Sequence, residues 1–100
     1  MNRIPQKVIL HSISGYDEKH DFLLQSLIDE KIRLFCTIGK DCELFHDIMD
    51  ELIVGDGTTE LDFLMITTWH EDETLEGVIE FARNFEIEDV ADEKIKIIEI

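Results

Sequence analysis

Four short apolar segments, rich in β-branched residues, alternate along the chain with three segments of helical periodicity, and this alternation constrains the fold more than any other feature. The expected strands are Gln6–Ile13, Ile32–Ile38, Leu61–Thr68 and Lys94–Ile100. The expected helices are Asp17–Lys31, a segment that begins at Asp41 and reaches Leu52–Val54, and a segment that begins near Asp72 and reaches Phe85. Such a regular alternation of strand and helix is typical of a parallel sheet with helices on both faces.

These elements predict a single α/β domain over residues 1–100, a three-layer sandwich of the Rossmann- or flavodoxin-like kind. We expect a four-stranded parallel sheet in the order 2-1-3-4, because right-handed crossovers restrict the topologies and this order is the simplest. The third strand is almost continuously apolar, which favours a central place covered on both faces. In this order the first helix covers one face, and the second and third helices lie side by side on the other.

Acidic residues are concentrated in the middle of the chain. The formal net charge is −15, and residues 41–93 hold eighteen acidic residues but a single basic one, Arg83. If the second and third helices share a face, their carboxylates form one acidic surface. The candidates for binding a protein there are Glu43, Asp47, Asp50, Glu51, Glu76 and Glu80. Such a field disfavours nucleic acids and anionic lipids and favours a basic protein as partner, although acidic residues also serve solubility alone.

Polar side chains follow the ends of the first and third expected strands, where an open parallel sheet binds its ligands. The candidates for binding a ligand are Ser12, Ser14, Thr67, Thr68, His70 and Cys42. The hydroxyl groups could orient a ligand, and the imidazole could exchange protons near neutral pH. The other interpretation is that the two threonines only end a strand and the histidine is a surface loop residue. The position of Cys42 beside the apolar stripe of its helix favours a buried, inert thiol.

Several known kinds of site are absent from the sequence. It has no glycine-rich nucleotide-binding loop, and acidic residues at all three helix starts disfavour phosphate, so we expect no cofactor. The histidines lack zinc-ligand spacing, and the segment from Asp56 has Leu61 where an EF-hand loop has glycine, so we expect no metal. Cys36 and Cys42 do not form a CxxC pair, and no membrane span or secretory signal is visible; together these features predict reduced thiols in a cytoplasmic protein.

Three stretches of the sequence, Ile38–Glu43, Asp50–Gly57 and Thr67–Glu76, are similar to segments of a family of small bacterial proteins of unknown function. The similarity covers roughly residues 8–86. The resemblance implies a bacterial origin and no particular activity. It directs interest to Asp41 and Cys42 and to Thr67–His70.

Two functions from different classes are compatible with these features. The first is a non-catalytic interaction protein, of the inhibitor or immunity type, whose acidic helical face binds a basic protein. The second is a small-molecule-binding or hydrolytic domain whose site lies at the carboxyl ends of the first and third strands. The uneven distribution of charge favours the first. The sequence leaves open whether the protein is an enzyme, and which oligomeric state it adopts.

Overall fold

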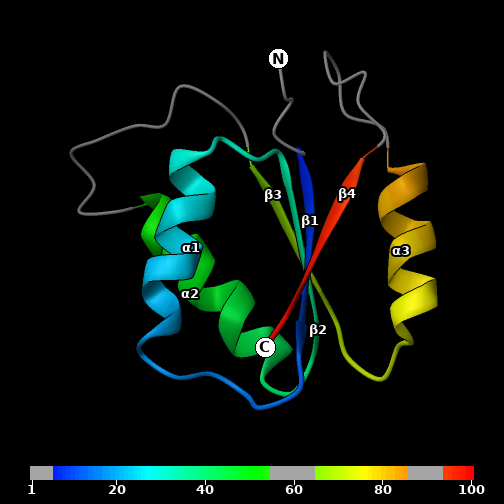
Figure 1. The fold of residues 1–100 in the computed structure, drawn as a ribbon, viewed down its shortest axis with the longest axis horizontal. Helices are drawn as coiled ribbons and strands as arrows, with labels where there is room; N and C mark the ends of the chain where they lie inside the picture. The colour runs from blue at the N-terminus through cyan, green and yellow to red at the C-terminus, as the bar shows by residue number, and fades with distance from the viewer. Residues whose placement is uncertain (1–5, 55–64, 86–93) are drawn as a thin grey trace.

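The computed structural model describes residues 6–54, 65–85 and 94–100, in which strands and helices alternate (Figure 1). The strands are β1 (Lys7–Ser12), β2 (Leu34–Gly39), β3 (Ile66–His70) and β4 (Ile95–Glu99), and the helices are α1 (His20–Asp29), α2 (Cys42–Val54) and α3 (Leu75–Asn84). The predicted α/β sandwich with a four-stranded parallel sheet is confirmed. That a single domain spans residues 1–100 stays a prediction, because part of this range lies outside the described residues.

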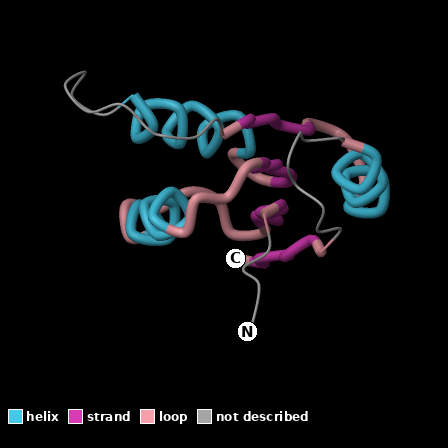
Figure 2. Tube along the Cα trace, turned by 90° about the horizontal axis from the view of Figure 1, so that it is seen from above, coloured by secondary structure: helices cyan, strands magenta, loops and turns pink. Residues whose placement is uncertain are grey.

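The sheet is parallel throughout, and its strands follow one another in the order β3-β2-β1-β4 (Figure 2). Lys7 of β1 is paired with Leu34 of β2 on one side and with Ile95 of β4 on the other. The predicted order 2-1-3-4 has to be corrected, because β3 pairs with β2 instead of β1 and lies at an edge instead of the centre. Right-handed crossovers allow both orders, and an apolar pattern does not determine which edge receives the next strand.

Of the helices in the described ranges, α1 and α2 lie together on one face of the sheet and α3 lies on the other (Figures 1 and 2). The steps from β1 to β2 and from β2 to β3 run in the same direction across the sheet, so right-handed crossovers place both helices on one face. The step from β3 to β4 runs back across the sheet and places α3 on the opposite face. The expectation that α2 and α3 lie side by side is therefore wrong.

Both faces of the sheet bury apolar side chains. Because side chains alternate along a strand, Val8 and Leu10 pack toward α1 and α2, whereas Ile9 packs toward α3. Phe45 of α2 and Val78 of α3 are fully buried against the two faces. Burying an apolar side chain of this size contributes about 1.5–3 kcal/mol, so these contacts hold the helices against the sheet.

Lys7 joins the first strand to the end of the last helix. Its side chain is buried, and its Nζ donates hydrogen bonds to the main-chain oxygens of Ala82 (2.6 Å) and Phe85 (2.7 Å). These carbonyls lie at the carboxyl end of α3, where a helix leaves acceptors without intrahelical partners and its dipole is negative. The buried ammonium group therefore has the partners that it needs.

The ends of several elements differ from the expected ones. The helix α1 begins three residues after Asp17, because that residue forms a turn ahead of the helix. Thr74, two residues after the expected start near Asp72, caps α3, since its hydroxyl accepts a backbone N–H of the first turn. The strand β3 extends to His70, and residues 61–64 of the predicted strand lie outside the described part of the chain.

Candidate functional site

An open groove of about 390 Å³ lies beyond the carboxyl ends of β2 and β3. It is lined by Gly39, Asp41, Cys42, Glu43, Leu44, Asp47 and Glu71, and we call it the acidic groove. The chain leaves β2 toward the face that carries α2, and it leaves β3 toward the face that carries α3 (Figure 2). The groove therefore lies where successive connections diverge, which is the usual place for a ligand in an open parallel sheet.

Gly39 allows the chain to turn sharply from β2 into α2. Its φ is 96°, and a Cβ at this position would lie 2.1 Å from the main-chain oxygen of Ser12. The N–H of Lys40 donates to the same oxygen (2.9 Å), and the N–H of Tyr16 donates to Oδ2 of Asp41 (3.0 Å). These contacts fix this side of the groove against the end of β1 and the loop that follows it.

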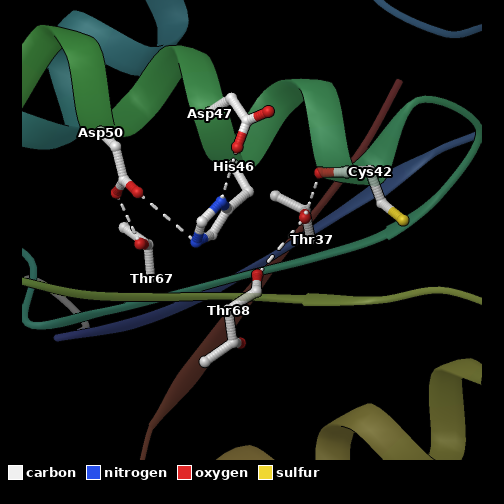
Figure 3. A network of polar contacts seen from close by, with 7 residues as sticks. All are labelled: Thr37, Cys42, His46, Asp47, Asp50, Thr67 and Thr68. Atoms are coloured by element: carbon white, nitrogen blue, oxygen red, sulfur yellow. Dashed lines mark hydrogen bonds and ion pairs between the residues drawn. The ribbon is translucent and has the colours of Figure 1, made fainter.

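Cys42 begins α2 and is buried between the helix and the sheet. The hydroxyl of Thr37 donates to its main-chain oxygen (2.7 Å), as Figure 3 shows. Burial raises the pKa of the Cys42 thiol, so it is protonated at neutral pH and is a poor nucleophile. Burial also raises the pKa of Cys36 to about 11. Neither thiol has the electrostatic surroundings of a catalytic cysteine.

The acidic groove carries negative charge from several elements. Its carboxylates belong to Asp41, Glu43, Asp47 and Glu71, and none of the lining residues in the described ranges is basic. Like charges around a concave surface reinforce one another's field and attract cations. Among the described residues, no group of three or more His, Cys, Asp or Glu side chains is arranged to hold a metal ion. The groove suits a lysine or arginine side chain, which can donate hydrogen bonds to more than one carboxylate.

A chain of polar contacts joins α2 to β3 beside this groove (Figure 3). The hydroxyl of Thr67 donates to Oδ1 of Asp50 (2.6 Å), whose Oδ2 lies 3.5 Å from Nε2 of His46. The other ring nitrogen of His46 lies 3.2 Å from Oδ1 of Asp47, a residue of the groove. The imidazole packs against the indole of Trp69 with ring centroids 4.6 Å apart, although Trp69 stays 45% exposed. An exposed aromatic side chain therefore lies beside the carboxylates of α2.

A second chain of hydrogen bonds lies on the other face of β3. Nε2 of His70 lies 2.8 Å from Oγ1 of Thr68, and Nδ1 lies 2.8 Å from Oε2 of Glu73. His70 is only 6% exposed, and its ring packs edge-on against Phe81 of α3 with centroids 4.7 Å apart. Enzymes that catalyse acyl transfer use the same arrangement, in which a hydroxyl contacts an imidazole and the imidazole contacts a carboxylate. It also has a structural effect, since it holds the turn between β3 and α3.

The structure does not bring the predicted ligand-binding residues together at one place. Because β2 lies between β1 and β3, Ser12 and Ser14 are separated from the residues of β3. Ser12 is also 2% exposed, and its hydroxyl accepts the N–H of Gly15 (3.1 Å). Of the six candidates, only Thr68 and His70 contact each other through their side chains. The site predicted from the first and third strands therefore does not form as expected.

The predicted protein-binding residues are divided between two sides of the molecule. Glu43, Asp47, Asp50 and Glu51 lie on α2, and Glu76 and Glu80 lie on α3. Glu80 is already engaged by Arg83 (3.3 Å). The structure instead places Glu71 beside the start of α2, and Glu71 was not among the site residues predicted from the sequence. The sequence held a usable signal for Glu71, because this residue follows directly on the third strand and so had to lie at its carboxyl end.

Comparison with known proteins identifies the family. The family model described as "Domain of unknown function (DUF7684)" matches residues 8–100. The chain belongs to this family. The prediction that it resembles a family of unknown function is thereby confirmed. No curated protein and no solved structure matched the chain. In the described ranges, none of the helices has the length and apolar character needed to cross a membrane.

Proposed function

We propose that this member of the family is a non-catalytic interaction module that binds a basic protein, as an inhibitor or immunity protein does. The observation that carries the proposal is the acidic groove, whose described lining has four carboxylates and no lysine or arginine. A lysine or arginine side chain of the partner would supply the missing positive charge. The surface differs from the predicted one, because it combines α2 with the turn after β3 instead of combining α2 with α3.

Exposed apolar side chains beside the groove support a protein as the ligand. Leu44 and Trp69 are both partly exposed; Leu44 lines the groove, and Trp69 packs against His46, whose ring contacts carboxylates of α2. Protein interfaces commonly have an aromatic anchor surrounded by polar and charged residues that exclude water. A basic partner could therefore bury the indole while its cationic side chains occupy the groove.

The charge of the whole chain supports the same kind of partner. A formal net charge of −15 produces a negative field that reaches beyond direct contact and accelerates encounter with a basic protein. Because the Debye length is about 8 Å at physiological ionic strength, this contribution should weaken steeply as salt is added. We also propose a cytoplasmic location, because both described cysteines are free and buried, as expected in a reducing compartment.

Affinity capture with paired charge variants tests this proposal. The immobilised protein is incubated at low salt with lysate from cells that produce it. The double variant Asp47→Asn, Glu71→Gln removes two charges from the groove, and Glu76→Gln, Glu80→Gln removes two from α3 as a matched control. We expect a basic protein to be retained by the wild type and the control and to be lost from the groove variant. The proposal fails if no basic protein is retained, or if the two variants lose it equally.

A second candidate function is acid–base or hydrolytic chemistry by Thr68, His70 and Glu73. The observation that favours it is the pair of 2.8 Å contacts that join the three side chains. The lining of the acidic groove does not include them, and the ring of His70 is covered by Phe81. For these reasons we rank it second. The test is hydrolysis of activated esters. Loss of hydrolysis in Thr68→Ala but not in Thr67→Ala would support this function, and equal rates in both variants would exclude it.

A further inference from the structure

The outer edge of β3 offers backbone groups to an additional strand. The N–H of Ile66 donates to Arg33 at the start of β2 (2.9 Å), so the backbone groups of Ile66 point toward β2. Successive residues of a strand direct their backbone groups to opposite sides, so those of Thr67 and Trp69 point away from β2. Among the described residues, β3 pairs only with β2 (Figure 2). These N–H and C=O groups therefore lie where a further strand would bind.

The two edges of the sheet differ in how they resist pairing. Proteins protect an exposed edge with lysine, proline or a bulge. The edge strand β4 has Lys96 within it and Lys94 directly before it, whereas β3 (Ile66–His70) contains no lysine and no proline. In the described part of the chain, the β3 edge therefore lacks the lysine protection that the β4 edge has.

Carboxylates lie on both faces of the β3 edge. On the face of α2, Asp50 accepts a hydrogen bond from Thr67, and on the face of α3, Glu73 lies 2.8 Å from His70. The two carboxylate side chains are about half exposed, 48% for Asp50 and 49% for Glu73. Each is thus held at the strand and still accessible to a partner's cationic side chain.

We propose that an extended segment of a basic protein adds to the outer edge of β3 as a fifth strand. This inference rests on the proposed function and specifies how the partner binds. Backbone hydrogen bonds to Thr67 and Trp69 would provide affinity, and alternate side chains would provide specificity. On the face of α2, a basic residue would lie near Asp50 and an apolar one near Trp69. On the other face, a basic residue would lie near Glu73.

Charge makes a basic segment the favoured occupant over a second copy of this chain. If two copies paired through β3, their Asp50 and Glu73 carboxylates would be brought together, and like charges across an interface are unfavourable. Pairing of β3 with β4 of another copy would bring opposite charges together, but it would continue from copy to copy without closure. Both arrangements would be visible as self-association.

Binding of a synthetic peptide tests strand addition in the wild-type protein. The probe is an extended peptide with the repeat Lys-Lys-Val-Val, which places lysine and valine alternately on each face. The control is the same peptide N-methylated at successive backbone amides, which keeps its charge but prevents pairing along either edge. Fluorescence anisotropy at physiological salt should show that the probe binds at least about ten-fold more tightly than the N-methylated control. Several backbone hydrogen bonds form with the probe and cannot form with the control.

Edge variants then locate the binding. Thr67→Pro removes an outward N–H without removing a hydrogen bond to β2, whereas Thr67→Val removes only the side-chain hydroxyl. The N–H of Ile100 donates to His11, so the backbone groups of Ile97 point away from β1, and Ile97→Pro is the matched control on the other edge. We expect Thr67→Pro to abolish the preference for the unmethylated peptide, and the other two variants to keep it.

The outcomes separate this inference from the proposed function. Strand addition would be overturned if the wild type bound both peptides equally and the double variant Asp47→Asn, Glu71→Gln bound them more weakly. The acidic groove would then be the binding site. Absence of binding by either peptide, or loss of the preference in Ile97→Pro, would also overturn strand addition. If the isolated protein forms oligomers in sedimentation, and Thr67→Pro abolishes them, the β3 edge binds a second copy of the chain. That result would overturn the inference. Failure of the capture experiment would remove the proposed function itself.

Discussion

The ammonium group of Lys7 lies 2.6 Å from the main-chain oxygen of Ala82, so a residue of the first strand holds the end of the last helix. The contact joins positions 75 residues apart in sequence. It lies on the face of the sheet that α3 alone covers among the described helices (Figure 1), and it joins β1 to the carboxyl end of that helix.

Replacement of Lys7 by methionine should therefore destabilise the protein. The change keeps most of the side-chain volume but removes the ammonium donor from the carbonyls of Ala82 and Phe85, and the Ala82 carbonyl keeps only the N–H of Phe85 (3.3 Å). Losing hydrogen bonds from a charged donor to buried acceptors should lower the free energy of unfolding by about 2–3 kcal/mol, as measured by urea denaturation. Lys40→Met changes an exposed residue and should have little effect. Equal effects would show that the contact with α3 is not the cause.

Substitution of Gly39 by alanine should disrupt the β2–α2 turn. The Cβ would meet the main-chain oxygen of Ser12, and the positive φ adds strain for any residue with a side chain. We expect a loss of at least about 2 kcal/mol in unfolding free energy. Gly77→Ala is the comparison, because its Cβ would lie 3.3 Å from the Thr74 hydroxyl and alanine favours a helix. Thermal unfolding that is the same for both variants would contradict the prediction.

The hydroxyl of Tyr16 donates to Oδ1 of Asp21 (2.6 Å), and this hydrogen bond to the carboxylate is the main cause that raises the pKa of Tyr16 to about 12. The chain has one tyrosine, so tyrosinate absorbance reports on it alone. Removing the acceptor with Asp21→Ala should return the midpoint toward 10. Glu18→Gln, which removes only a more distant charge, should shift it much less. Circular dichroism at each pH shows whether the protein is still folded. A midpoint near 10 in the folded wild type would contradict the contact.

The buried thiols should be unreactive in the folded protein. Burial raises the pKa of Cys36 to about 11, and it also raises that of Cys42. At neutral pH both should react with a thiol reagent only when the protein unfolds. An acid whose pKa is raised by folding holds its proton more tightly in the folded state. Stability should therefore fall as pH rises from about 9, where the unfolded thiol ionises, to about 11. Cys36→Ser should remove part of this slope, and rapid labelling of the native protein would contradict the prediction.

Local elements of this fold could be predicted from the sequence, because each depends on short-range patterns. The apolar repeat around Phe45 and Met49 predicts α2, and the structure buries both residues. The β-branched run that contains Ile9 predicts β1 in the same way. The strand order could not be predicted in this way. The strand beside which β3 pairs depends on long-range packing and not on the apolar pattern of β3 itself.

In the candidate site, too, local features could be predicted from the sequence and long-range contacts could not. The helix-start acids Asp41 and Glu43 are visible in the sequence, but their proximity to Glu71 depends on β3 lying next to β2. The hydrogen bond between Asp50 and Thr67 depends on the same pairing. Once the order of two strands was assigned incorrectly, the predicted acidic surface included α3 in place of the turn after β3.

The placement of β3 and β4 at opposite edges affects how the sheet can assemble during synthesis. The second and third strands can each add directly beside the preceding one as the chain emerges from the ribosome. The last one, Ile95–Glu99, has to cross the finished part of the sheet to reach β1. Until then the β1 edge is open in the nascent chain, so the assembly of this sheet exposes an unpaired strand edge that can mispair.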